Sequence, residues 1–499
     1  MEGAISAVTG ELVSRCISFL KSQCSRATTE QQKMDRLHHL LLRVRTVVEE
    51  ADGRYITNSG MVAQLQVLAD AMYRGYRVVD SLRYRTLEKN TLLEEVSEPH
   101  TFSFASSLKR CRTVTFGGRK DKAVNLELDG ALDMLETATT HMAEFVVLLA
   151  GCERMLRRPY DVHLYIDNFM FGRHTEKQKL LNFLLQQNNP AGPPPVLPII
   201  GGYAVGKKSL VAHACNDNRV SSCFSLILHL NEDDVSRLEK HERFMEGKTL
   251  IVVEFVSCMN EKVWAEFYSS LSNMKKGSKV IIVSKLRNIE NFGTVKPIFL
   301  NALTYEEFSY LFKTLAFGSA NPAEHPHLVR IADEFSKELQ LRWSLLTANV
   351  VADAMRLNLK VQFWLWMLQS CRRAAERNIS LFGKLPKILT EQGHHVDMTD
   401  FELSPAAPLY LSWSRIADPS MKKELPKVTF EELLVDPPSG KPLVDTNVTP
   451  KRGEFTIITW ESRIAPYTSF VAHHIVQNID QDMPEEAPLS GRKRQGVPI

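Results

Sequence analysis

Several features that would place this 499-residue sequence in a familiar class are missing from it. Its eight cysteines form no C-x-x-C pair and no cysteine–histidine spacing suited to zinc, so reduced thiols are expected. No run of about 18 apolar residues occurs, so no transmembrane helix is expected. The opening residues, MEGAISAVTGELVSR, lack the basic and apolar regions of a signal peptide. These absences predict a cytoplasmic protein, with a nuclear or plasma-membrane-associated pool left open.

The excess of positive over negative charge is also small. The formal net charge is only +3, so nucleic acid is not an expected partner. No repeat with a period of roughly 20–30 residues is visible, and a leucine-rich solenoid is therefore not expected in this chain. The hydrophobic share of 44% and the charged share of 24% are instead typical of ordinary globular domains.

Over residues 1–150, the apolar residues recur with the period of an α-helix. Apolar residues recur there at helical spacing in four segments, and an antiparallel four-helix bundle would bury all four stripes. The stripes are Ile5, Val8, Leu12 and Ile17; Met34, Leu37, Leu41, Val44 and Val48; Met61, Leu65, Leu68, Met72 and Val79; and Leu128, Leu132, Leu135, Met142 and Leu149. The amphipathic first segment, residues 4–20, could alternatively touch a membrane surface.

Residues 158–315 change to short apolar runs separated by helical stretches. The runs are VLPII (196–200), FSLILHL (224–230), TLIVVEFV (249–256), KVIIVS (279–284) and PIFLNAL (297–303). Continuous apolar strands that alternate with helices predict a parallel sheet covered on both faces. Residues 316–400 are predicted to form a helical subdomain. Residues 401–499 are predicted to form a Pro-rich extension of unclear fold with some β-structure, such as FTIITW (455–460).

The first apolar run opens the stretch VLPIIGGYAVGKKSL, residues 196–210. Gly201, Gly206 and Lys207 fit the spacing G-x-x-x-x-G-K directly after a predicted strand. The amides of such a loop and the N-terminus of the next helix attract phosphate, and the lysine can reach the terminal phosphates. A nucleotide site is therefore predicted, with a fortuitous glycine-rich turn as the alternative. Its residues are Gly201, Gly202, Gly206, Lys207, Lys208, Ser209 and Leu210.

Two positions needed for metal-assisted hydrolysis carry unsuitable residues. Lys208 stands where a Ser or Thr hydroxyl would hold Mg²⁺. At the end of TLIVVEFV, Glu254 could contact the metal through water, but Phe255 follows it, and a ring cannot polarise water. Glu254 is thus a weak metal candidate, with a solvent-facing carboxylate as the alternative. Mg²⁺ is doubtful, and no catalytic residue is predicted.

In their order and spacing these motifs resemble those of plant intracellular immune receptors (NLRs) of the coiled-coil plus NB-ARC type, over roughly residues 1–345. GGYAVGKKSLVAHACND is similar to the family's GPGGVGKTTLAxxVYND, and GSKVIIVSK (277–285) is similar to GSKIIVTTR. The stretch 68–86 resembles a grass-type variant of the family's EDVID helix. The resemblance implies that Arg173 and Lys285 also contact the nucleotide.

The resemblance further implies a multidomain α plus α/β fold with a P-loop NTPase-type sheet, and a plant defence regulator that binds ADP or ATP. This sequence departs from the family at Lys208 and Phe255, and Gln340 replaces a proline that packs on adenine in the family. Weak nucleotide binding with little or no hydrolysis is therefore expected, in a protein that acts through protein–protein interaction. The alternative is an active ATP-hydrolysing signalling switch.

A cluster of arginines and tyrosines in the third predicted helix is the candidate interaction surface. This arginine–tyrosine face consists of Tyr73, Arg74, Tyr76, Arg77 and Arg83. Arg and Tyr tend to dominate interface energies. The face is therefore predicted to bind other immune receptors or signalling proteins, or a second copy of the chain. A solvated face with extended arginines is the alternative.

Overall fold

The computed structural model describes residues 30–94, 117–154, 172–186, 192–237, 247–257 and 260–401, and the shorter segments 410–411, 414–415, 427, 430, 434–436, 441–442, 454–462 and 469–475. The chain divides into two compact units. One comprises residues 1–372 and 461–468, and the other comprises residues 373–460 and 469–499.

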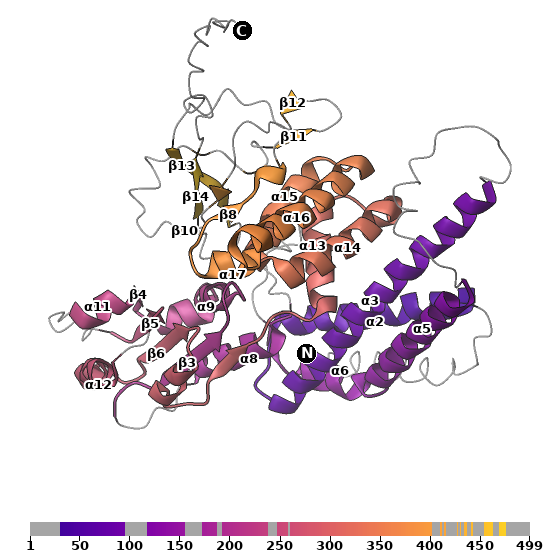
Figure 1. The fold of residues 1–499 in the computed structure, drawn as a ribbon. Coiled ribbons are helices and arrows are strands. Elements are labelled where there is room, and N and C mark those ends of the chain that lie inside the picture. Colours follow the sequence, from indigo (N-terminus) through magenta and orange to yellow (C-terminus); the bar gives the residue numbers. More distant parts are fainter. Residues whose placement is uncertain are drawn as a thin grey trace, which may run out of the picture. The chain divides into compact units, whose positions relative to one another are not determined.

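The N-terminal helices are α2 (Glu30–Asp52), α3 (Ser59–Glu94), α5 (Gly117–Thr140) and α6 (Met142–Ala150). The long helix α3 packs against both α2 and α5 (Figure 1). Three of the four predicted apolar stripes meet in one core, whose buried members include Leu37, Val44, Leu65 and Leu135. The predicted opening helix, residues 4–20, lies outside the described residues, so a four-helix bundle stays a prediction.

The predicted helix over residues 128–149 is interrupted at His141, where α5 has ended and α6 begins. The hydroxyls of Thr137, Thr139 and Thr140 each donate to a backbone carbonyl of the preceding turn, at 2.7–2.9 Å. Side chains that bond back in this way, and β-branched side chains in general, weaken a helix. The interruption leaves the apolar residues on both sides of it buried in the same core.

Five parallel strands form the central sheet, in the order β4-β5-β6-β3-β7. They are β3 (Val196–Gly201), β4 (Leu226–Leu230), β5 (Thr249–Phe255), β6 (Lys279–Ser284) and β7 (Ile298–Leu300). Each predicted apolar run supplies one strand, so the predicted parallel sheet is confirmed. The carboxyl ends of all the strands therefore meet at one edge, where ligands bind in folds of this class.

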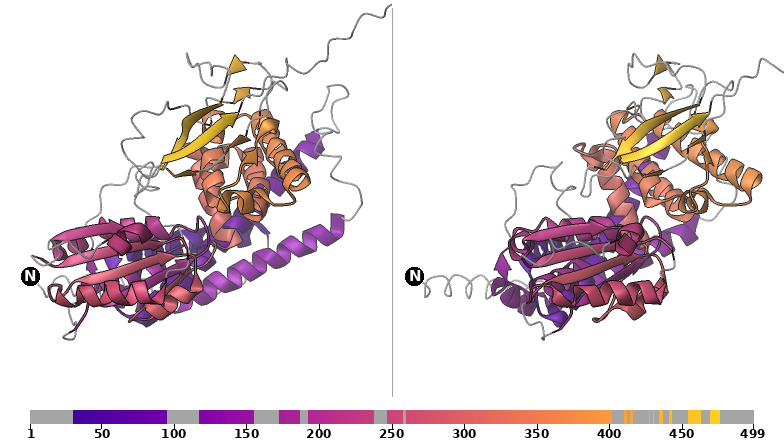
Figure 2. Two further views of the ribbon diagram at one scale, coloured as in Figure 1. Left: turned by 60° about the vertical axis from the view of Figure 1, so that its left-hand side comes forward. Right: turned by 90° about the vertical axis from the view of Figure 1, so that its left-hand side faces the viewer.

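Helices cover both faces of this sheet, as Figure 2 shows from two sides. On one face lie α8 (His174–Leu185), α9 (Lys207–Cys215) and α10 (Asn218–Cys223), which bury Leu180, Leu210 and Val220 against the strands. On the other lie α11 (Glu232–Arg237) and α12 (Glu261–Ser270), where Trp264 and Phe267 are buried. Burial on both faces explains why the strands are apolar throughout.

A group of longer helices follows the sheet: α13 (Tyr305–Phe317), α14 (Pro326–Arg342), α15 (Leu345–Leu357) and α16 (Val361–Phe382). Thr304 and Glu307 form a capping box at the start of α13. Trp364 is fully buried, and its Nε1 donates to Met355 O (3.0 Å) and Asn358 O (2.9 Å). These bonds anchor α16 to the end of α15.

The second unit contains the end of α16, the helix α17 (Pro386–Glu391) and several strands. Its sheet of order β10-β14-β13 consists of Ser414–Arg415, Ser469–Ile475 and Glu454–Glu461. Two antiparallel pairs join β8 (Val396–Asp397) to β9 (Tyr410–Leu411), and β11 (Val435–Asp436) to β12 (Lys441–Pro442). The predicted strand-like patch FTIITW lies in β13, so the expected β-structure is present.

Short elements complete the two units. An antiparallel pair joins β1 (Arg54–Tyr55) to β2 (Glu153–Arg154). Single 3₁₀ turns are η3 (Leu271–Asn273), η4 (Arg287–Phe292), η5 (Pro322–Glu324) and η6 (Thr399–Phe401). In the part of the chain that the structure describes, no helix combines the length and the apolar character needed to cross a membrane.

Candidate functional site

The glycine loop, residues 201–206, joins β3 to α9 at the carboxyl edge of the sheet. Gly201 pairs with Leu300 of β7, and a Cβ at Gly201 would lie only 2.6 Å from Leu300 O. Gly206 has a φ of 90°, a left-handed conformation that glycine adopts without strain. The two glycines of the predicted motif therefore serve different physical needs, a close strand contact and the turn into α9.

Lys207 brings positive charge back over the glycine loop. Its Nζ donates to Gly201 O (2.7 Å) and Gly202 O (2.5 Å), which are neutral backbone acceptors. The N-terminus of α9 adds further positive potential at the same place. Leu210 packs in the core beneath the loop and so fixes the first turn of α9. A phosphate group fits this combination of loop amides, helix N-terminus and ammonium.

The two residues that replace the expected metal ligands contact each other. Lys208, in the first turn of α9, forms an ion pair with Glu254 near the end of β5, between Nζ and Oε1. Glu254 lies on the face of β5 that also carries Leu250 and Val252, because side chains alternate along a strand. That face is the one that α9 covers. The Lys208 ammonium therefore fills the space between residues 208 and 254, the two positions from which the motif would bind Mg²⁺.

This set of donor groups does not fit Mg²⁺. Mg²⁺ requires oxygen ligands in near-octahedral geometry, whereas the Lys208 ammonium offers no lone pair and the Glu254 carboxylate is already paired with it. Phe255 lies on the opposite face of β5, is 1% exposed and meets Trp264 edge-on, with ring centroids 5.8 Å apart. Among the described residues, no group of three or more His, Cys, Asp or Glu is placed to hold a metal ion. The weak metal assignment of Glu254 therefore finds no support in this geometry.

Arg173 lies beside the glycine loop. It directly precedes α8, is 5% exposed, and donates from one guanidinium nitrogen to Val205 O (3.2 Å) and Asn301 O (2.6 Å). Burial lowers the pKa of the guanidinium, although the carboxylates of Glu176 and Glu307 act in the opposite direction. The side chain thus ties the loop to the residue after β7, and its contact with a nucleotide stays a prediction.

Lys285 and Gln340, which the sequence analysis also identified, have different surroundings. Lys285 directly follows β6 and is exposed at the carboxyl edge that also carries the glycine loop. Gln340 stands where the family has its adenine-packing proline. It lies on α14 and donates from Nε2 to Leu303 O (2.9 Å), which links α14 to the segment before α13. Lys285 therefore shares the edge of the candidate site, whereas Gln340 makes a structural bond.

The arginine–tyrosine face is partly covered by α13 of the same chain. The rings of Tyr73 and Tyr76 each lie 5.2 Å from the ring of Tyr310, and Tyr73 is 1% exposed. The Arg77 guanidinium lies 5.7 Å from the centroid of the Tyr305 ring. Tyr73 is therefore buried in the chain itself, and Tyr76 and Arg77 are half-buried, so the binding of a partner by these three residues stays a prediction. The periodicity of a single helix cannot show which other helix packs on it.

Arg74 and Arg83, the other two residues of that face, are exposed. One guanidinium nitrogen of Arg83 lies 3.2 Å from His38 Nε2. Their binding to a partner stays a prediction. Sequence reasoning missed Tyr310 and Lys313, which bring α13 onto α3. The available signal was that α13 carries aromatic residues on more than one face, a pattern that indicates two packing partners.

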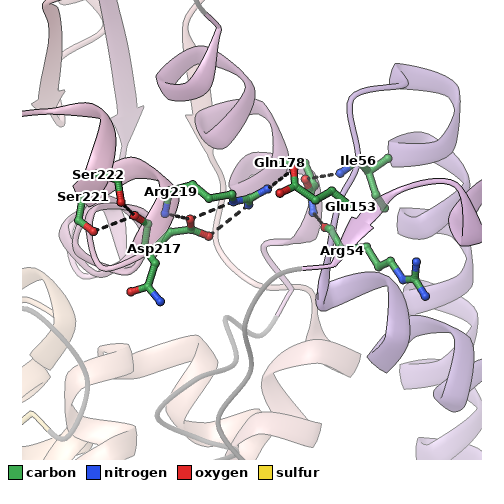
Figure 3. Close-up of polar contacts among 9 residues, drawn as sticks. Arg54, Ile56, Glu153, Gln178, Asp217, Arg219, Ser221 and Ser222 are labelled. Carbon is green, nitrogen blue, oxygen red and sulfur yellow. Dashed lines mark hydrogen bonds and ion pairs between the residues drawn. The ribbon is translucent and has the colours of Figure 1, made fainter.

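Helix α8 connects the glycine loop to the N-terminal helices by polar bonds. The Gln178 side chain accepts from Ile56 N (3.1 Å) and donates to Arg54 O (2.9 Å), as Figure 3 shows. Lys177 Nζ lies 3.1 Å from Asp52 Oδ1, with both side chains buried. Although burial alone would raise the pKa of the Asp52 carboxyl, the Lys177 ammonium holds it well below its usual range. A single helix that begins beside the loop therefore also fixes the position of α2.

Similarity to known proteins points in one direction. No protein-family profile matches the chain. It is 23% identical to disease resistance protein RGA2 of Solanum bulbocastanum over 355 residues, which cover 66% of this chain and 35% of that protein. It is 22% identical to putative disease resistance protein RGA1 of the same species over 348 residues, 64% of this chain and 34% of that protein.

The chain is also similar to a putative disease resistance protein of a second species. The chain is 25% identical to putative disease resistance RPP13-like protein 1 of Arabidopsis thaliana over 237 residues, 45% of this chain and 21% of that protein. It spans about a third of the length of the two Solanum bulbocastanum proteins. Over about two thirds of its own length, this chain is similar to NLR-type plant disease resistance proteins.

Proposed function

We propose that this chain is an NLR-like plant defence regulator that binds ADP or ATP weakly at the glycine loop, hydrolyses little or none of it, and acts through protein–protein interaction. The observation that carries the proposal is the ion pair between Lys208 and Glu254. It lies beside a loop that keeps the glycines and Lys207 of a phosphate site, yet it stands where hydrolysis needs a metal ion. Similarity to disease resistance proteins supports the defence role.

The proposed weakness of nucleotide binding follows from charge. The loop amides, the N-terminus of α9 and Lys207 attract the phosphates, and Arg173 and Lys285 are the additional proposed contacts. Without a divalent cation, a larger part of the phosphate charge is left without neutralisation. At the adenine end, Gln340 is already bonded to the backbone of Leu303.

An active ATP-hydrolysing switch is the less well supported alternative. It would need a metal ligand at position 208 and a carboxylate beside the attacking water. Lys208 is paired with Glu254, and Phe255 is packed in the core. None of these side chains can take up those tasks without leaving its partner.

The proposed partners are other immune receptors or signalling proteins, or a second copy of this chain, and the proposed location is the cytoplasm. Binding is proposed to use the N-terminal helices. On the arginine–tyrosine face, Arg74 and Arg83 are exposed, whereas Tyr73 and Tyr76 contact Tyr310 of α13. A partner at this face would therefore meet the arginines first.

Calorimetric titration of the purified chain with ADP and with ATP tests the nucleotide part of the proposal. Binding at micromolar to millimolar concentration is expected, and Lys207→Ala should weaken it by at least about tenfold because a charged hydrogen-bond donor is lost. Lys262→Ala, at an exposed lysine of α12, is the matched control and should leave binding unchanged. If millimolar ADP and ATP give no heat, and acid extraction releases no nucleotide, the chain is not a nucleotide-binding protein.

A further inference from the structure

We infer that the ion pair between Lys208 and Glu254 makes this a site for a nucleoside diphosphate free of divalent cation, at which magnesium weakens binding instead of strengthening it. The inference rests on the proposed function and adds the chemical form of the ligand. It depends on the contact between the Lys208 ammonium and the Glu254 carboxylate, and on the places of these residues in α9 and β5.

Both members of the pair stand on rigid elements. Lys208 lies between Lys207 and the buried Leu210 in the first turn of α9, a helix fixed against the sheet by Leu210 and Val211. Glu254 lies in β5, where it is in register with Val283 of the neighbouring β6. Each side chain is 34% exposed, so the pair lies at the surface of the site and is accessible to a ligand. The contact is therefore a feature of the folded chain that a ligand would meet.

The charge of the pair favours a diphosphate. The charges of the Lys208 ammonium and the Glu254 carboxylate sum to zero, whereas Lys207 adds a positive charge to the loop. A third phosphate would bring additional negative charge toward the Glu254 carboxylate, with no divalent cation between them. Like charges at short range are costly where water is partly excluded. A bare triphosphate should consequently bind more weakly than a bare diphosphate.

Magnesium is expected to act as a competitor for the ligand. To enter the site, Mg²⁺ would have to separate Lys208 from Glu254 and then lie next to a displaced ammonium. In solution, by contrast, Mg²⁺ readily binds nucleotide phosphates and so lowers the concentration of the free nucleotide. By mass action, the apparent affinity of the chain for ADP should then fall as magnesium is added.

Fluorescent ADP and ATP analogues, titrated with the full chain in excess EDTA and in millimolar MgCl₂, test the inference. The wild-type chain should bind the ADP analogue about tenfold more tightly in EDTA than in MgCl₂. In EDTA it should prefer the ADP analogue to the ATP analogue. Lys275→Thr, at an exposed lysine outside the site, should behave as the wild type does.

Two variants separate the roles of the pair. Lys208→Thr with Glu254→Asp restores a hydroxyl and a short carboxylate, and magnesium should then strengthen binding. Glu254→Gln removes only the carboxylate charge and should raise affinity for the ATP analogue in EDTA by about tenfold, with a smaller gain for ADP. The wild-type comparison of EDTA with MgCl₂ needs no variant, so it decides the question even where a variant does not fold.

Each outcome is decisive. Binding that is tighter in MgCl₂ than in EDTA for the wild-type chain would overturn this inference and leave the proposed nucleotide binding intact. A wild-type preference for the ATP analogue in EDTA would overturn the assignment of a diphosphate. No binding of either analogue in either buffer would overturn the proposed function and this inference together.

Discussion

At the scale of single residues, two unusual substitutions compensate for each other. A lysine in the first turn of a helix is unfavourable by itself, because the helix dipole already makes that end positive. A carboxylate next to a phosphate loop becomes unfavourable when phosphate binds, because the two groups carry charge of the same sign. Since Lys208 and Glu254 contact each other, each supplies the charge that the other lacks. The pair therefore offsets both penalties, and we propose that it takes the place of a metal ion.

The buried position of Phe255 limits whether a water-activating carboxylate can be introduced there by substitution. Phe255→Asp should lower the free energy of unfolding by about 3–5 kcal/mol, because it would bury a carboxylate beside Trp264. Urea unfolding followed by tryptophan fluorescence measures this loss. Phe255→Leu, which keeps an apolar side chain in the same place, should cost only about 1–2 kcal/mol. Equal stability of the two variants would show that position 255 is not part of the core.

His213, on α9, predicts a pH dependence of stability. Burial lowers its pKa to about 4, and the Lys177 ammonium acts in the same direction, while Asp52 and Asp217 oppose them. The unfolded chain, with a histidine pKa near about 6.5, then binds more protons than the folded chain between these two values. Stability should therefore rise with pH through this window, be complete above it, and be lost on acidification.

The contribution of His213 can be measured by replacement. After a discount for its partial exposure, we expect it to account for about 2 kcal/mol of the stability lost between pH 6.5 and pH 4. His213→Gln should flatten the plot of unfolding free energy against pH over that window. His141→Gln, at an exposed histidine between α5 and α6, is the control for loss of an imidazole. An unchanged slope in His213→Gln would place the origin of the acid sensitivity elsewhere.

At the scale of elements, both α13 and α14 pack on α3 and so join the helices after the sheet to those before it. Tyr310 of α13 contacts Tyr73 and Tyr76, and Lys313 forms an ion pair with Asp80. The Lys313 and Asp80 side chains are 13% and 23% exposed, so the pair is shielded from solvent in part. A charge pair in such a place is worth more than one on the open surface.

A charge exchange tests this contact. Asp80→Lys should lower the free energy of unfolding by about 1–2 kcal/mol, since two ammonium groups would then face each other. Adding Lys313→Asp should recover at least half of that loss, as a double-mutant cycle measures. Asp129→Lys, which faces Lys33 in a more exposed pair, should cost less than about 0.5 kcal/mol. Failure of the second substitution to recover stability would mean that the two side chains do not interact in solution.

How far each element could be predicted depended on whether its environment leaves a pattern in the sequence. Strands buried on both faces are apolar throughout, so all five runs gave strands of the sheet. The break at His141 was missed because the apolar stripe continues across it and only the threonines mark it. The contact of Tyr73 with Tyr310 was missed because each residue was consistent with its own helix, and nothing local relates the two helices.

At the candidate site, too, one part could be predicted from the sequence and another could not. The glycine spacing predicted the strand, loop and helix, because backbone conformation at Gly206 and the close approach at Gly201 restrict those positions to glycine. The sequence also identified Lys208 and Glu254 as departures from the motif. Their contact depends on which face of β5 is covered by α9, and this arrangement of elements is not contained in either segment alone.

At the scale of the whole molecule, α8 relates the parts of the first unit to one another. It begins beside the glycine loop at Arg173 and is bonded to α2 through Lys177 and Asp52. The same unit contains the sheet, the N-terminal helices and α13, so a ligand at the loop would lie one helix away from the N-terminal helices. Since the chain spans about a third of the disease resistance proteins RGA2 and RGA1, its role is best tested on the chain itself.

Single-turnover hydrolysis is the most direct test of the central claim, that this chain holds nucleotide without cutting it. Excess protein is mixed with ATP labelled at the terminal phosphate, with and without magnesium, and the bound nucleotide is identified over several hours. We predict that the bound ATP is recovered intact, with phosphate release no faster than in the Lys207→Ala variant. Magnesium-dependent conversion of bound ATP to ADP that Lys207→Ala abolishes would contradict the account and identify the chain as an active switch.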